Sequence, residues 1–257
     1  MAKTGRYLYG LMLAEADVDF GAIGLVNEGS PGRVHTLRVD SLGAVVSDFA
    51  SGERLLPLRK HLEPHNRVIL EVMKTTTVIP MTFGHVARSD EAIRKTLRLH
   101  RQAIRSQLDR VDGAVEMGLK VKWDVENIFE HLVSINPELK ARRDQVFGRS
   151  GGGGQNEKME LGKLFEESLN RERDDQTDRL LELLKGSVRE AKVNAPKGEK
   201  MLMDAAFLVD RDAQKAFEAR VVEVAEGFPE EYLFDLSGPW APFHFVDLDL
   251  GLDADNG

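Results

Sequence analysis

The order of extended and helical patterns in the second half of the chain constrains the fold more than any other feature. The segment "VEMGLKVKWD" (115–124) alternates apolar and polar residues, as a strand with one buried face does. A long amphipathic helical stretch follows, and then "MLMDAAFLVD" (201–210) is extended, 211–227 is helical and "EYLFDLSG" (231–238) is a last strand. This order predicts an α+β domain with a modified ferredoxin-like fold and a long helical insert at about 125–195.

The first half of the chain also mixes strands and helices. "YLYGLML" (7–13), "VHTLRVD" (34–40) and "GAVVSDF" (43–49) have strand patterns, and the glycine-containing residues after the first strand are interpreted as a connector. Residues 57–76 have a helical pattern. A further helix is expected to begin at Ser89 and to bury an apolar stripe made of Ile93, Leu97, Ile104, Leu108 and Val111.

These patterns predict two α+β domains, residues 1–112 and residues 113–257, with the boundary near Asp112 and Gly113. The acidic end of the chain, "DLDLGLDADNG" (247–257), is expected to fray.

Composition excludes several classes of function. A formal net charge of −8 disfavours nucleic acid as the main partner. The absence of cysteine excludes disulfides and thiolate chemistry and is typical of a reducing cytoplasm, where we expect the protein to act. No apolar run approaches the ~18 residues of a membrane span, so no membrane partner is expected.

The chain contains no recognisable catalytic or metal-binding motif. His61 and His65 in "HLEPH" have helical i, i+4 spacing, but Leu62 stands where a zinc protease needs glutamate, so packed or surface histidines are expected. The glycine run 151–154 lacks the Gly-Lys-Ser/Thr ending of a phosphate-binding loop and is interpreted as a linker. We therefore predict no catalytic residue, no metal and no cofactor.

One aromatic stretch near the C-terminus stands on unusually stiff backbone. In "FDLSGPWAPFHFV" (234–246), Pro239 and Pro242 bracket Trp240, and neither proline can donate to a β-ladder. This backbone is therefore confined to a sheet edge or a turn. Trp240 either fills the core of its own domain or binds a partner, and the sequence is compatible with both roles.

Four arginines recur with helical spacing in the expected helix after Ser89. At about 100° per residue they lie in a narrow stripe beside the apolar face. Such a stripe is either a solvated face paired with acidic side chains of the same chain or a docking surface for an acidic partner. The residues are Arg94, Arg98, Arg101 and Arg105.

Five segments in this order resemble the gas vesicle protein F/L family (GvpF/GvpL), and the resemblance covers almost the whole chain. They are "YLYGLM", "TVIPMTFG" (77–84), "VEMGLKVKWD", "AAFLVDRD" (205–212) and, most specifically, "GPWAPFHFV" (238–246). Two positions depart from the family pattern: Thr82 stands where a basic residue is common, and His85 replaces a small hydroxyl residue.

The resemblance implies a non-enzymatic role in building gas vesicles, as an assembly factor or a minor structural component. It implies a cytoplasmic or vesicle-bound protein that binds the hydrophobic shell subunit and other gas vesicle accessory proteins and limits aggregation of the shell subunit. An F-type and an L-type role are both compatible with it. We expect the apolar edge around Leu236, Trp240, Phe243 and Phe245 to be the contact surface. The competing interpretations are a small-molecule or nucleotide-binding ferredoxin-like regulator and an enzyme with the helical insert as a lid.

Overall fold

The computed structural model describes residues 4–27, 29–50, 55–148 and 153–251, so part of the glycine run lies outside the described residues. The chain divides into two compact units, Met1–Glu116 with Pro239–Gly257, and Met117–Gly238. The first division lies close to the boundary expected at Asp112 and Gly113. The residues from Pro239 onward, however, group with the first unit, whereas the sequence pattern placed them in the second.

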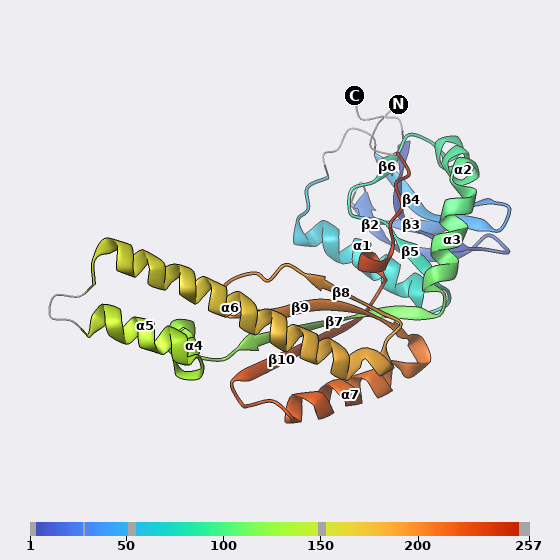
Figure 1. Cartoon of the computed structure of the whole chain (residues 1–257). Helices are drawn as coiled ribbons and strands as arrows, with labels where there is room; N and C mark the ends of the chain where they lie inside the picture. Colours follow the sequence, from blue (N-terminus) through green and yellow to red (C-terminus); the bar gives the residue numbers. More distant parts are fainter. Residues whose placement is uncertain (1–3, 28, 51–54, 149–152, 252–257) are drawn as a thin grey trace. The chain divides into compact units, whose positions relative to one another are not determined.

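An antiparallel sheet forms the middle layer of the first unit (Figure 1). Its order is β2-β3-β4-β1-β5, and β6 also pairs with β1. Pro80 lies in β5, at an edge of this order, where the missing N–H of a proline is tolerated. The strands are β1 (Thr4–Leu13), β2 (Asp19–Asn27), β3 (Ser30–Val39), β4 (Leu42–Ala50), β5 (Val78–Pro80) and β6 (Val86–Ala87).

The strand β2 corrects the interpretation of this region as a connector. Its glycines hid the strand pattern, but one of them is required by packing. A Cβ on Gly24 would lie 2.5 Å from the hydroxyl of Tyr9, and that same hydroxyl accepts a hydrogen bond from Leu25 N at 2.8 Å. Glycine therefore allows β2 to approach the buried tyrosine.

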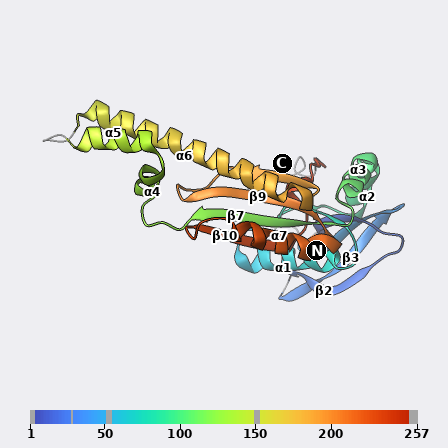
Figure 2. The same cartoon turned by 60° about the horizontal axis from the view of Figure 1, so that its bottom comes forward.

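Helices cover both faces of this sheet (Figure 2). The helix α1 (Arg59–Met73) packs on the face of Tyr7 and Tyr9, and it continues through Pro64 instead of being interrupted there. Proline removes the hydrogen bond to the carbonyl of Lys60, and because Lys60 is an exposed residue in the first turn of the helix, water can take the place of the missing N–H donor.

The opposite face packs against α2 (Asp90–Leu99) and α3 (Arg101–Val111). The expected apolar stripe is confirmed, because all of its members are buried. The expected single helix is instead two helices that meet at His100, whose φ of −99° and ψ of 14° bend the chain.

The second unit has a four-stranded sheet in the order β10-β7-β9-β8. Its strands are β7 (Ala114–Trp123), β8 (Glu190–Asn194), β9 (Met201–Asp210) and β10 (Tyr232–Trp240). Its helices are α4 (Ile128–Ile135), α5 (Pro137–Phe147), α6 (Gln155–Leu184) and α7 (Gln214–Glu226). Disregarding the extra helices, the element order is β-α-β-β-α-β, so the predicted ferredoxin-like α+β fold is confirmed.

The helical insert differs from the prediction at both ends. The first helix begins at Ile128 and Asn127 caps it: the Asn127 side chain accepts from Phe129 N at 2.9 Å and from Glu130 N at 3.3 Å. At the other end, β8 lies inside the range assigned to the insert. This strand is short and has only β9 as a neighbour, so its sequence lacks the apolar run of a buried strand.

Candidate functional site

The aromatic turn, defined as Pro239–Phe245, follows the edge strand β10. Gly238 has a φ of 123°, a backbone region that disfavours any side chain, and this explains a glycine at the start of the motif. Pro239 lies on β10, which has only β7 beside it, and Pro242 precedes a short 3-10 turn, η3 (Phe243–Phe245). The expectation that both prolines lie at a sheet edge or a turn is confirmed.

The aromatic residues of this stretch have different environments. Trp240 is 42% exposed and Phe243 is 37% exposed, whereas Phe245 is completely buried. Phe245 therefore fixes the turn to its own unit, and the other two keep surface that a partner can cover. Leu236, on the part of β10 that belongs to the second unit, is half-buried.

A buried carboxylate on β7 holds the turn in place. Glu116 is 5% exposed, and both of its carboxylate oxygens accept hydrogen bonds from His244. One bond comes from the backbone N–H at 2.9 Å and the other from the ring Nδ1 at 2.7 Å. His244, which follows the exposed Phe243, is thus held in place by Glu116, a residue 128 positions earlier in the chain.

A cavity of about 310 Å³ lies beside Phe243 in the first unit. Its walls are the residues after β5 on one side and the end of the chain on the other, including Met81, Val246 and Leu248. Two polar residues in its lining, Thr82 and His85, hydrogen-bond to each other through Oγ1 and Nε2 at 2.8 Å. The two departures from the family pattern are therefore in direct contact.

Residues 247–251 form part of this site, which corrects the expectation of fraying for them, and the rest of that segment, 252–257, lies outside the described residues. Leu250 is 7% exposed and belongs to the core cluster of the first unit, and Val246 and Leu248 pack against that cluster. The aspartates between them, Asp247 and Asp249, are exposed. This alternation buries one side of the segment up to Gly251, the last described residue.

A buried polar network holds the turn after β5, whose residues line this cavity. His65 of α1 is 2% exposed, and its Nε2 lies 3.1 Å from the carbonyl oxygen of Met81. A carbonyl can only accept, so Nε2 carries the proton, and Nδ1 accepts from the hydroxyl of Tyr7 at 2.8 Å. The Tyr7 oxygen in turn accepts from Gly84 N at 3.1 Å. Every polar atom of this chain of bonds is satisfied, which fixes the turn after β5.

Burial also sets the protonation states of this network. It lowers the pKa of His65 from 6.5 to about 4, with a smaller contribution from the nearby His85. It raises the pKa of Tyr7 above its usual range. Both nitrogens of His65 are occupied and the ring is neutral near pH 7, in agreement with the expected packing role.

Each of the four arginines predicted as a stripe forms an ion pair within the first unit. Arg98 pairs with Glu91 at 2.5 Å, Arg101 with Asp40 at 3.3 Å and Arg105 with Asp109 at 3.3 Å. Arg94 lies 4.0 Å from Asp90. Arg98, Arg101 and Arg105 line one shallow hollow, whereas Arg94 lines a different cavity.

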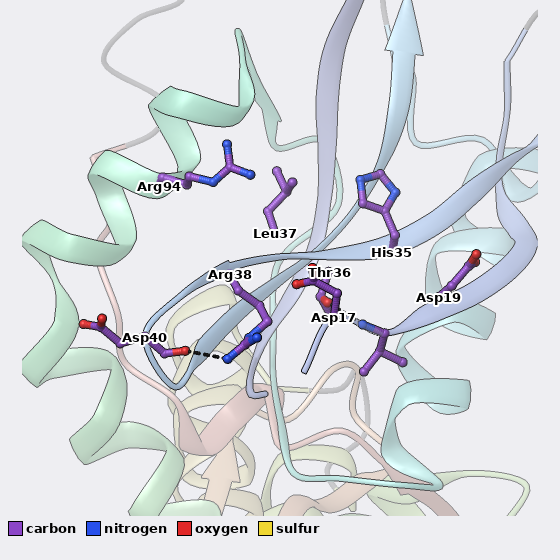
Figure 3. Close-up of a pocket in the computed structure, with 9 residues that line it drawn as sticks. Asp17, Asp19, His35, Thr36, Leu37, Arg38, Asp40 and Arg94 are labelled. Carbon is purple, nitrogen blue, oxygen red and sulfur yellow. Dashed lines mark hydrogen bonds between the residues drawn. The ribbon is translucent and has the colours of Figure 1, made fainter. Parts of the chain in front are cut away.

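The cavity beside Arg94 mixes both signs of charge (Figure 3). It measures about 700 Å³ and is lined mainly by β3 and by the start of β2 with the residues before it, among them Asp17, Asp19, His35 and Arg38. Arg38 is already bound to the carbonyl oxygens of Ala14 and Asp40, both at 3.0 Å. Opposite charges so closely mixed do not select one ligand chemistry, and this cavity carries no functional assignment.

Two further observations concern metals and membranes. Within residues 4–251, leaving aside the undescribed gaps, no three His, Asp or Glu side chains gather closely enough to hold a metal ion. In the same part of the chain, none of the helices combines the length and the apolar character that crossing a membrane requires.

The fold and the site define a class: an α+β protein with a ferredoxin-like unit and a rigidly held pair of exposed aromatic residues. The sequence signature of the family described as "Gas vesicle synthesis protein GvpL/GvpF" matches residues 5–247. The chain belongs to this family, which gives it a role in gas vesicles and not in catalysis.

Individual relatives agree with this membership. The chain is 27% identical to gas vesicle protein F of Haloferax mediterranei, covering 98% of this chain and 97% of that one. It is 27% identical to gas vesicle protein L of a Streptomyces species, covering 86% and 85%. Its fold is similar to the crystal structure of GvpF from Anabaena, with a TM-score of 0.81 at 23% identity over 96% of this chain and 99% of the other.

Proposed function

We propose that the protein assists gas vesicle assembly by binding the hydrophobic shell subunit and limiting its aggregation. Family membership supports the gas vesicle role, and the aromatic turn supports the contact. An unassembled apolar subunit exposes surfaces that aggregate, and a protein that covers them needs apolar area on a rigid frame. Trp240 and Phe243 supply that area, and Phe243 also lines the cavity of about 310 Å³.

The observation that carries the proposal is the rigidity of these two exposed side chains. Pro239 and Pro242 restrict the backbone, Phe245 is buried, and Glu116 holds His244 through two hydrogen bonds. A preorganised aromatic pair loses little conformational entropy on binding, which is typical of residues that dominate an interface. The half-buried Leu236 on the edge strand β10 remains a separate candidate contact.

The experiment compares Trp240→Ala and Phe243→Ala with Phe147→Ala, a matched control. Phe147 ends α5 in the second unit and is 56% exposed, so it offers an aromatic side chain at least as accessible as those of Trp240 and Phe243. Each variant is coexpressed with the shell subunit, and the soluble fraction of that subunit and its affinity for the variant are measured. Loss of the aromatic contact should cost about 2 kcal/mol, or roughly thirtyfold in Kd.

The control variant should keep the shell subunit soluble. The proposal is wrong if both turn variants bind and solubilise the shell subunit as the wild type does. A loss caused by unfolding is recognised from a matching fall in melting temperature.

A further inference from the structure

A second exposed surface lies on α2 and α3, apart from the aromatic turn. Its centre is Leu99, which at 75% is the most exposed large hydrophobic residue in the described part of the chain. Arg98, Arg101, Gln102 and Arg105 surround it and line a hollow of about 590 Å³. We call these five residues the Leu99 surface.

The fold forces Leu99 outward. Ile93 and Leu97 of α2 and Ile104 and Leu108 of α3 all pack into the core of the first unit. Leu99 lies two positions after Leu97, on the far side of the helix, and the bend at His100 follows directly. Because the core is filled by the other residues, folding of this unit does not explain a leucine at this position.

The arginines around Leu99 are held only weakly. Their side chains are 53%, 64% and 52% exposed for Arg98, Arg101 and Arg105, and each pairs with an exposed carboxylate. Exposed ion pairs contribute only about 0–1 kcal/mol, so these carboxylates are exchangeable for those of another molecule. Together the two helices carry six Lys or Arg against three Asp or Glu, in a chain of net charge −8.

We propose that the Leu99 surface binds an acidic protein segment that places an apolar side chain between its carboxylates. Leu99 would contact the apolar group, and the three arginines would pair with the acids. The acidic segment is complementary in charge to the arginines of the Leu99 surface, and its apolar side chain accounts for the exposed Leu99. The proposal extends beyond the aromatic turn, since it requires neither Trp240 nor Phe243.

A nucleic acid fits the surface less well. A phosphate backbone makes no use of a central leucine, and the net negative charge of the whole chain opposes the approach of a long polyanion. An anionic lipid surface meets the same long-range repulsion. The experiment below tests binding of a nucleic acid and of an anionic lipid surface as well.

The test measures binding of the full chain to a fluorescent synthetic peptide by anisotropy. The peptide has about 15 residues, with leucine at helical spacing and otherwise glutamate and glutamine. The variants are Arg98→Glu with Arg101→Glu, and Leu99→Ser. Arg59→Glu is the control, because Arg59 is an exposed arginine on α1 that, like the three arginines of the Leu99 surface, pairs with an exposed carboxylate, here Glu63 at 3.8 Å.

The double charge reversal should weaken binding at least about tenfold, and Leu99→Ser should weaken it several-fold. Arg59→Glu should bind as the wild type does, and wild-type binding should fall as salt rises past about 0.1 M. Unchanged melting temperatures would show that the variants fold.

The proposal is overturned if the peptide does not bind, or if a peptide with every glutamate replaced by glutamine binds equally well. It is also overturned if single-stranded DNA or phosphatidylserine vesicles bind more tightly than the peptide and lose that binding in the same variants. None of these outcomes affects Trp240 or Phe243, so failure here is distinguishable from failure of the proposed function.

Discussion

The neutral, buried His65 should make the stability of the protein depend on pH. Its pKa is about 4 in the folded chain against 6.5 for an unperturbed histidine, a difference of about 2.5 units. Between these two values the unfolded chain binds a proton that the folded chain does not bind. Stability is therefore fully present above pH 6.5 and decreases as pH falls towards 4.

The magnitude follows from the shift. Each pKa unit corresponds to about 1.4 kcal/mol, so His65 should cost about 2–3 kcal/mol of stability at pH 4.5 relative to pH 7.5. Because many carboxylates also titrate in this range, the contribution of His65 is isolated by comparison with His65→Gln. Glutamine can still donate to Met81 and accept from Tyr7, but it does not titrate.

The assay is urea unfolding of both proteins at the two pH values. The variant should be less stable near pH 7.5, because the ring packing is lost, and the difference in stability between wild type and variant should shrink by about 2–3 kcal/mol near pH 4.5. His61→Gln is the control: His61 lies one turn earlier on α1, and its ring bonds to the carbonyl of Leu56 at the surface. A wild-type-to-variant gap for His65 that is the same at both pH values would refute the reasoning.

Three further predictions concern the turn and the insert. Chemical denaturation should show that Glu116→Ala lowers stability by about 1–3 kcal/mol. His244→Ala should lower it by less, because only Glu116→Ala leaves the backbone N–H of residue 244 without its acceptor. The double variant should be as stable as Glu116→Ala alone. Phe245→Ala should cost roughly 3–5 kcal/mol in the same measurement, whereas Trp240→Ala should cost clearly less, and equal costs would contradict the burial difference. Asn136→Ala should cost about 1 kcal/mol, read as a small fall in melting temperature, because Asn136 accepts from two backbone N–H groups at the start of α5.

Local sequence determined the features that depend on neighbours in the chain. The period of "VEMGLKVKWD" predicted β7, because alternation acts within a few residues, and Asn136 with Pro137 starts α5 by bonds that are equally local. The prolines of the aromatic motif predicted an edge or a turn for the same reason. The order of such elements was enough to predict the ferredoxin-like unit.

Local patterns failed where long-range packing decided the outcome. Gly24 of β2 is required because the strand approaches Tyr9, and in the acidic segment after Val246 the side chains of Leu248 and Leu250 pack on the core of the first unit. Glu116 looked like an ordinary charged residue of a strand. The alternation places Glu116 with Lys120 and Lys122 among the polar positions of β7, so no local signal marked it as buried, and its partner His244 is distant in the chain.

The aromatic motif shows the division most clearly. Its sequence specified stiff backbone and three aromatic side chains, and it left open whether Trp240 fills a core or faces a partner. Only the tertiary structure separated the three, since Phe245 is fully buried while Trp240 and Phe243 keep exposed surface. The physical reason is that burial depends on which distant residues pack around a side chain. The local sequence around these aromatic residues does not specify those neighbours.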